Sequence, residues 1–280
     1  MINQTVLMSG AECFALDQKI NPYYDDGPVD VARAVIDHDN VAQCLREAGV
    51  EVVKVAPPAG AQDGIYTANW ALIRNRKAIL ARLPDARKTE EEYAELVLGN
   101  LGYEVVRVPE DWHFSGQGDN LVVGKYLIAG CGYRSDARAC EFAADELDLE
   151  LVQIHAIPEL ENGVAKINAV SGWPDSRFYD IDLAVAVLRD DLIAYYPDAL
   201  DEVSRVRMEN LPLETIKVDY DEAVNGMACN LVSTGETVIM SSRAPKLRQQ
   251  IERRGFKVLM PDVREITRGG GFIRCVSLTL

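Results

Sequence analysis

The sequence predicts an α/β fold in which five ββαβ-like modules surround a pseudo-fivefold axis. Two repeating patterns lead to this prediction. A helix-like stretch, a turn and an apolar strand recur five times along the chain, and an apolar hairpin precedes four of the five copies. Because one hairpin and one helix cannot bury their own apolar face, several such modules must share a core.

The helix–turn–strand pattern ends each time in a strand that carries Val, Leu or Ile at every second or third position, as a half-buried strand does. The five copies are LREAGVEVVKV (45–55), LGNLGYEVVRV (98–108), ADELDLELVQI (144–154), MENLPLETIKV (208–218) and IERRGFKVLMP (251–261). Glycine stands at the turn in three copies, which is typical of the end of a helix.

The four hairpins read WALIRNRKAIL, NLVVGKYLIAG, LAVAVLRDDLIAY and NLVSTGETVIM, with Asn, Asp or Gly at their turns. Polar stretches with one apolar stripe, such as KTEEEYAELVLGN, follow them and predict helices. The first module lacks a hairpin at its start. We expect the C-terminal segment FIRCVSLTL to complete this module as a strand and to close the ring, so that residues 1–280 form a single domain. An ordinary α/β sheet with chance internal similarity is the alternative.

The composition limits the classes of molecule that the chain is expected to bind. The 280 residues carry a formal net charge of -15, with a pI near 4.7, so the chain repels nucleic acid and anionic membranes. It has no apolar run long enough to span a bilayer and no signal-peptide pattern at its start. The six cysteines show no CxxC spacing. We therefore expect a cytoplasmic protein with reduced thiols, no metal and no cofactor.

Five stretches rich in polar groups and glycine lie at the module junctions. They are QDGIYTANW (62–70), FSGQGDNLV (114–122), AGCGYRSD (129–136), RFYDIDLAV (177–185) and GGGFIRC (269–275). Together they supply acids, amides, arginines and thiols. Catalytic groups often lie on loops that a rigid scaffold holds in place, so these stretches are the candidate site.

Together with ECFALDQKINPYYD, these stretches resemble, in order, the motifs of the guanidino-group-modifying superfamily, the pentein fold. This superfamily includes arginine deiminase, dimethylarginine dimethylaminohydrolase and the amidinotransferases. The matches run from residue 13 to residue 280. The resemblance implies a five-bladed α/β propeller. It also implies a thiolate that attacks the central carbon of a guanidinium, so that a covalent thioether forms and an amine leaves.

The resemblance assigns roles to individual residues. It places Cys275 at the nucleophile, and it places Asp180 at the position that a proton-transferring histidine holds in the family. The residues at substrate-binding positions are Asp63, Asn69, Ser115, Arg134 and Asp182. Among them, Arg134 would bind a substrate carboxylate in a bidentate manner, and Ser115 replaces a glutamate.

The two replacements leave alternatives open. An aspartate with a pKa of about 4 is a poor acid at neutral pH unless burial raises that pKa. If Asp180 and Asp182 share one face of a strand, each raises the proton affinity of the other, which would let Asp180 act as general acid and base. Otherwise the ionised pair only binds a cation.

The sequence thus favours a cysteine-dependent hydrolase acting on a cationic, arginine-like guanidino or amidine compound. Amidino transfer is less favoured, because nothing marks a second amine site. One alternative is an impaired family member that binds such a ligand without turnover. Another is an interaction module with a vestigial pocket. A homodimer is left open.

Overall fold

The structure is a computed structural model that describes residues 2–280. It contains five three-stranded sheets built on one plan: the first two strands pair antiparallel, the second and third pair parallel, and a helix connects the second strand to the third. This is the predicted ββαβ-like module, and it confirms the α/β fold class.

The modules follow one another along the chain. Their sheets consist of β3 (Ala71–Arg74), β4 (Lys77–Leu80) and β5 (Glu104–Arg107); β6 (Asn120–Val123), β7 (Tyr126–Gly130) and β8 (Glu150–Ile154); β11 (Val185–Arg189), β12 (Leu192–Tyr195) and β13 (Glu214–Lys217); β14 (Val232–Ser233), β15 (Thr237–Ile239) and β16 (Lys257–Leu259); and β17 (Leu278–Thr279), β1 (Thr5–Ser9) and β2 (Glu51–Val55). The connecting helices, in the same order, are α2 (Lys88–Asn100), α4 (Ala137–Leu147), α5 (Glu202–Glu209), α7 (Pro245–Glu252) and α1 (Val31–Glu47).

Shorter elements lie between the modules. They are α3 (Gly116–Asp119), α6 (Tyr220–Val224), the small hairpin of β9 (Leu160–Glu161) and β10 (Val164–Ala165), and the 3-10 turns Thr67–Asn69, Asp85–Arg87, Ile181–Leu183, Pro197–Ala199 and Ile266–Gly269. Two of these turns contain predicted site residues, Asn69 and Asp182, and α3 directly follows a third, Ser115.

Local sequence explains the hairpins. Between β3 and β4, Asn75 and Arg76 have φ angles of 50° and 66°, the left-handed backbone that a two-residue hairpin turn of this kind requires. Gly124 has a φ angle of 57° at the turn between β6 and β7. The predicted hairpins are therefore confirmed, and their turns are formed by the residues that the sequence indicated.

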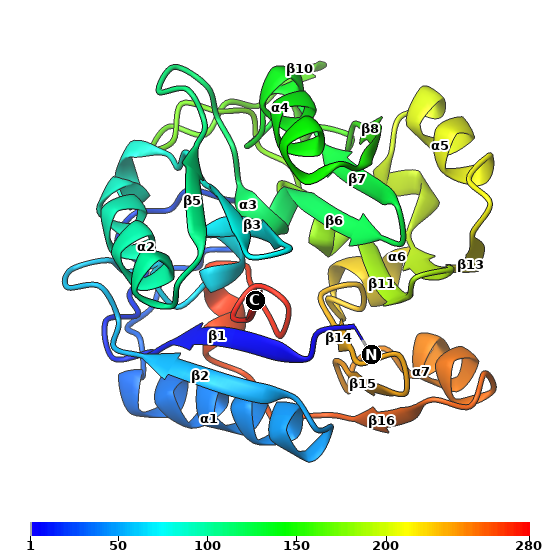
Figure 1. Ribbon diagram of the computed structural model, residues 1–280, viewed down its shortest axis with the longest axis horizontal. Coiled ribbons are helices and arrows are strands. Elements are labelled where there is room, and N and C mark those ends of the chain that lie inside the picture. Colours follow the sequence, from blue (N-terminus) through cyan, green and yellow to red (C-terminus); the bar gives the residue numbers. More distant parts are fainter. Residues whose placement is uncertain (1) are drawn as a thin grey trace.

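The modules are arranged around a centre (Figure 1). The first strands β3, β6, β11 and β14 lie nearest to it, and the helices α1, α2, α4, α5 and α7 lie at the periphery. Segments that precede the first strands of different modules are thereby brought close together. Among residues 2–280, no helix combines the length and the apolar character that a bilayer crossing needs.

The two ends of the chain share one sheet. Strand β17 pairs antiparallel with β1, with Leu7 opposite Leu278, so the C-terminus completes the first module as predicted. The strand is shorter than expected, because only Leu278 and Thr279 belong to it, and Cys275 lies in a turn before it. Leu278 is fully buried in an apolar cluster with Leu7, Trp70 and residues of α2.

Removing the Leu278 side chain tests this closure. We expect Leu278→Ala to lower the free energy of unfolding by about 2–5 kcal/mol, because it leaves a cavity where two modules meet. Urea denaturation measures the change. Leu96→Ala is the matched control, because Leu96 on α2 is 61% exposed and its loss should change stability by less than about 0.5 kcal/mol. An effect of Leu278→Ala as small as that of the control would contradict the closure.

Candidate active site

The polar stretches meet at a small cavity, called here the site cavity, with about 210 Å³ of space between atoms, open solvent at its mouth included. Its lining residues are Ile20, Asn21, Tyr24, Asp63, Tyr66, Asn69, Arg87, Arg134, Tyr179, Gly269 and Cys275. Four of the seven predicted site residues are among them. The other three, Ser115, Asp180 and Asp182, are buried and contact lining residues.

The Cys275 thiol is held between an acid and an amide. Its Sγ lies 3.4 Å from Oδ2 of Asp182, to which the thiol can donate, and it accepts from Nδ2 of Asn230 at 3.1 Å. Burial raises the pKa of Cys275 well above its ordinary value, and the negative charges of Asp182 and Asp180 raise it further. Cys275 is therefore a thiol until a positive charge arrives beside it.

Asn230 fixes the backbone that carries the nucleophile. Its Oδ1 accepts hydrogen bonds from the backbone N–H groups of Phe272, Arg274 and Cys275, at 3.1, 3.0 and 3.1 Å. These N–H groups bond a side chain rather than a neighbouring strand, which explains why the segment before β17 is a turn. Asn230 is not among the site residues that the sequence predicted. The available signal was the repeat, because Asn230 precedes β14 as Asn69 precedes β3.

Asp182 lies in the 3-10 turn Ile181–Leu183 and not on a strand, so Asp180 and Asp182 do not share a strand face as expected. The cause is Asp119, whose Oδ1 accepts the N–H of Ile181 at 3.0 Å. Burial raises the pKa of Asp182 well above its ordinary value, the charge of Asp180 raises it further, and the positive charge of Arg274 opposes both. Asp182 is thus a carboxylate with high proton affinity beside the thiol.

Asp180 contacts a different set of groups. Its two carboxylate oxygens accept from Nδ2 of Asn69 at 2.7 Å and from Oγ of Ser115 at 2.9 Å. The Asn69 amide also accepts from Nη1 of Arg87 at 2.8 Å, and Arg87 forms a buried ion pair with Glu90 at 2.7 Å. All five side chains are buried. This network fixes Asp180 and Asn69, and it keeps Asp180 from bonding the thiol directly.

Arg134 and Asp63 supply charge to the cavity wall. Nη2 of Arg134 donates to the carbonyl of Ile20 at 2.9 Å, and its guanidinium lies 4.3 Å from the ring centre of Tyr179. Its remaining N–H groups can take a carboxylate. Asp63 accepts from the hydroxyl of Tyr24, and burial raises its pKa.

The described residues of the site provide neither a histidine for proton transfer nor a set of ligands for a metal ion. His113 is exposed, and its ring stacks on Trp173 at 4.3 Å, away from the site cavity. Within residues 2–280, no group of three or more His, Cys, Asp or Glu side chains is arranged to hold a metal ion. The arrangement instead provides a thiol, a proton acceptor and a negatively charged surrounding for a cation.

Comparisons with known proteins agree with this chemistry. The family model described as N,N dimethylarginine dimethylhydrolase, eukaryotic, matches residues 25–280. The N(G),N(G)-dimethylarginine dimethylaminohydrolase of Mycobacterium tuberculosis is 32% identical over 272 residues, which cover 95% of this chain and 82% of that protein. The bifunctional arginine dihydrolase/ornithine cyclodeaminase AgrE of Nostoc sp. is 31% identical over 280 residues, and the chain spans 37% of its length.

A solved structure extends the comparison. The N-terminal domain of an ArgZ variant, covalently bonded to a reaction intermediate, aligns with a TM-score of 0.87 at 29% identity. The alignment covers 98% of this chain and 96% of that one. The similarity therefore extends over nearly the whole chain.

Asn230→Ala tests the support of the nucleophile. It removes the acceptor of three buried N–H groups, so we expect the free energy of unfolding to fall by at least about 2 kcal/mol and the Cys275 segment to lose its fixed geometry. Urea denaturation measures the first effect, and the rate of Cys275 alkylation measures the second. Asn225→Ala is the control, because Asn225 is exposed and bonds only Asp221 through its side chain. Equal stability of the two variants would show that Asn230 supports nothing.

Proposed function

Because the chain belongs to the dimethylarginine dimethylaminohydrolase family of the pentein superfamily, we propose that it hydrolyses a carbon–nitrogen bond of an arginine-like guanidino compound through a covalent bond to Cys275. The observation that carries this proposal is the Cys275 thiol at 3.4 Å from the Asp182 carboxylate, on the wall of a cavity that Arg134 also lines. The covalent intermediate on the related ArgZ domain supports the route.

Charge selects the substrate. The guanidinium cation binds where Asp182 and Asp180 place negative charge, and Arg134 binds the carboxylate at the other end of an arginine-like molecule. Once bound, the cation offsets the negative charge that raises the pKa of Cys275. The substrate itself therefore favours ionisation of the thiol, and the thiolate forms only where it can react.

The first half of the reaction forms the thioether. The thiol proton passes to Asp182, and the thiolate attacks the central guanidinium carbon, so that an S–C bond forms. The protonated Asp182 then gives its proton to one nitrogen, the C–N bond breaks, and ammonia or an amine leaves. Asp182 is again ionised, and a cationic amidino group remains bonded to Sγ. The raised pKa of Asp182 suits it to both proton transfers.

The second half consumes water. Asp182 takes a proton from the water, whose oxygen bonds to the same carbon. The S–C bond breaks, its electron pair returns to sulfur, and a ureido product leaves. The protonated Asp182 returns its proton to sulfur, which restores the starting state, and the ureido product passes its hydroxyl proton to solvent, where the released ammonia or amine takes it up. The overall change is one C–N bond cleaved and one water consumed, with no external base.

Asp180 and Ser115 support the proton transfers of Asp182 without taking part in them. The resemblance assigns proton transfer to Asp180, whereas the distances favour Asp182, which contacts Sγ. We propose that Asp180 raises the proton affinity of Asp182 by its charge, and that Ser115 and Asn69 hold Asp180 in place. The related proteins are named as hydrolases, which favours turnover over binding alone.

We also propose a domain organisation and a cellular location for the protein. We infer that residues 1–280 act as one domain, since the first and the last strands share a sheet. The acidic chain and its reduced, unpaired cysteines fit a cytoplasmic location.

The nucleophile is tested by Cys275→Ser. We expect turnover to fall at least about 1,000-fold, because the hydroxyl cannot replace the thiolate. Release of ammonia or amine and of the ureido product is measured with arginine and with N-methylated arginines. Cys44→Ser is the control, because this half-buried thiol of α1 lies outside the site cavity and should leave turnover unchanged. Turnover retained in Cys275→Ser would rule out the covalent route.

Asp180→Asn tests the charge coupling by its pH dependence. Asp182 must be ionised to take the thiol proton, so activity rises with pH through the pKa of Asp182. Because the charge of Asp180 raises that pKa, removing the charge lowers it, and the acid limb of kcat/KM should move to lower pH. The exposed Asp111, changed to Asn, is the control and should leave the limb in place.

Two outcomes of this measurement would count against the assignment. An acid limb that does not move would show that the two carboxylates are not coupled. A complete loss of activity at every pH would show that Asp180 itself transfers the proton.

A further inference from the structure

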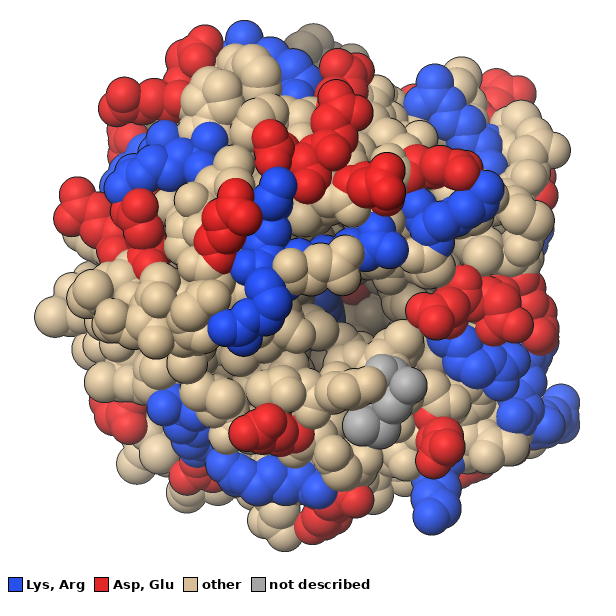
Figure 2. All heavy atoms as spheres, viewed as in Figure 1, with Lys and Arg blue, Asp and Glu red and all other residues tan. Residues whose placement is uncertain are grey.

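A second cavity lies where the first strands of three modules meet the two ends of the chain. Its accessible volume is about 220 Å³, and it shares no lining residue with the site cavity. This is less than the volume of about 300–1,000 Å³ that is typical of pockets for drug-sized ligands, so only a small molecule fits it. Figure 2 shows this face of the molecule hollowed near its centre.

Part of the wall of the second cavity is apolar. The apolar lining residues include Leu72 of β3, Val122 of β6, Val185 and Val187 of β11, and Leu231. Such walls favour a ligand with a hydrocarbon body, and a few polar groups among them would orient it.

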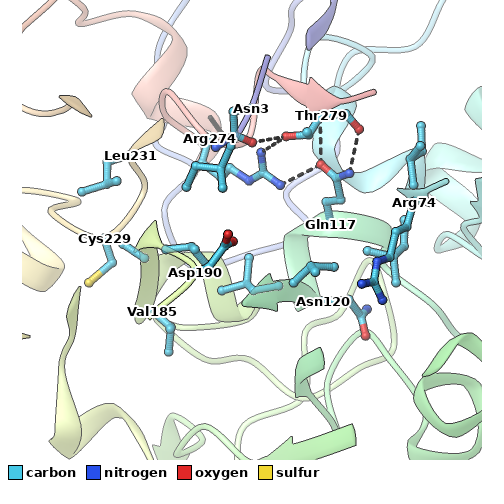
Figure 3. A pocket seen from close by; sticks show the side chains of 17 residues that line it. Asn3, Arg74, Gln117, Asn120, Val185, Asp190, Cys229, Leu231, Arg274 and Thr279 are labelled. Carbon is cyan, nitrogen blue, oxygen red and sulfur yellow. Dashed lines mark hydrogen bonds between the residues drawn. The ribbon is translucent and has the colours of Figure 1, made fainter. Parts of the chain in front are cut away.

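Arg274 brings an unpaired positive charge to this cavity. Its guanidinium donates to Oε1 of Gln117 at 2.7 Å, to Oγ1 of Thr279 at 2.8 Å and to the carbonyl of Ser277 at 3.4 Å, all neutral acceptors (Figure 3). Within residues 2–280 none of its hydrogen bonds uses Nε, and it has no carboxylate in ion-pair contact. Asp182 interacts with this half-buried guanidinium only through space, and all hydrogen-bond acceptors of the guanidinium are neutral, so an anionic group can still bind to its remaining N–H groups.

Asp190 supplies the opposite charge at the same cavity. It is exposed at the turn between β11 and β12, and in the described chain its carboxylate takes part in no ion pair or hydrogen bond. Figure 3 shows Asp190 across the cavity from Arg274. The two charges do not meet, and the space between them is bounded by apolar side chains. Arg74 of β3 also lines the cavity, and its guanidinium donates to the carbonyls of Leu147 and Asp148. A ligand with a negative group for Arg274, a positive group for Asp190 and a short hydrocarbon body matches this arrangement.

We propose that the second cavity binds a small zwitterionic amino acid, with its carboxylate at Arg274 and its ammonium group at Asp190. This site is separate from the site cavity. Its occupation does not depend on whether Cys275 is the nucleophile.

The test is calorimetric titration of the full chain with two amino acids, L-leucine and 5-aminopentanoate. They share the two charges and differ in their spacing. Pentanoate lacks the ammonium group, and pentylamine lacks the carboxylate. We expect saturable binding of at least one amino acid, at least tenfold tighter than that of either single-charge analogue. Binding should persist after Cys275 is alkylated, because alkylation blocks only the site cavity.

Asp190→Asn and Asp191→Asn form a matched pair of variants. Both residues are exposed in the same turn, and Asp191 does not line the cavity. We expect Asp190→Asn to weaken binding at least tenfold and Asp191→Asn to leave it unchanged. Arg274→Gln, which keeps a hydrogen-bonding side chain without the charge, should also weaken binding at least tenfold, with its folding checked by thermal denaturation.

Several results would overturn the proposal. One is that neither amino acid binds saturably. Another is that pentanoate or pentylamine binds as tightly as the amino acids. A third is that Asp190→Asn keeps full affinity. Loss of binding on alkylation of Cys275 would place the ligand in the site cavity and would also overturn it. Because none of these measurements uses turnover, failure of the proposed hydrolysis would leave the result intact.

Discussion

The pairing of β17 with β1 is the constraint on which the candidate site depends. Strand β17 has only two residues, and fully buried Leu278 anchors it against residues of two modules. With that anchor fixed, the segment before it must cross the interior, and Asn230 of the preceding module holds it there through three backbone N–H groups. The carbonyl of Cys275 also accepts the N–H of Ala68, just before β3. The nucleophile is thus fixed by contacts to two other modules.

The fivefold repeat explains why the chemistry converges. Each module carries one polar residue shortly before its first strand. These residues are Asn69, Asp119, Asp182, Asn230 and Cys275. Because the first strands lie nearest to the centre (Figure 1), their preceding turns meet there. Burial and the charge of Asp180 raise the pKa values of Asp119 and Asp182, so the interior holds protons tightly and favours a cationic ligand.

The sequence predicts those features whose signals are local. The five modules and their hairpins follow from apolar alternation and from turn residues such as Asn75 and Gly124. The positions of Cys275 and Asp182 followed from short motifs. The hydrogen bonds from the Cys275 segment to Asn230 leave no local sequence pattern, because these partners lie 42 to 45 residues from Asn230. The turn at Asp182 likewise depends on Asp119, which is 62 residues from Ile181. Apolar alternation cannot show where a distant side chain ends a strand.

Consecutive residues face the two cavities, and this links them electrostatically. Cys275 lines the site cavity, and Arg274 lines the second cavity. The positive charge of Arg274 lowers the pKa of Asp182 against the effects of burial and of Asp180. A carboxylate bound to Arg274 would offset that charge and raise the pKa of Asp182, so Asp182 would more often be protonated already and unable to take the thiol proton. Occupation of the second cavity should therefore slow thiolate formation at Cys275, because the charge of Arg274 acts on Asp182 through space.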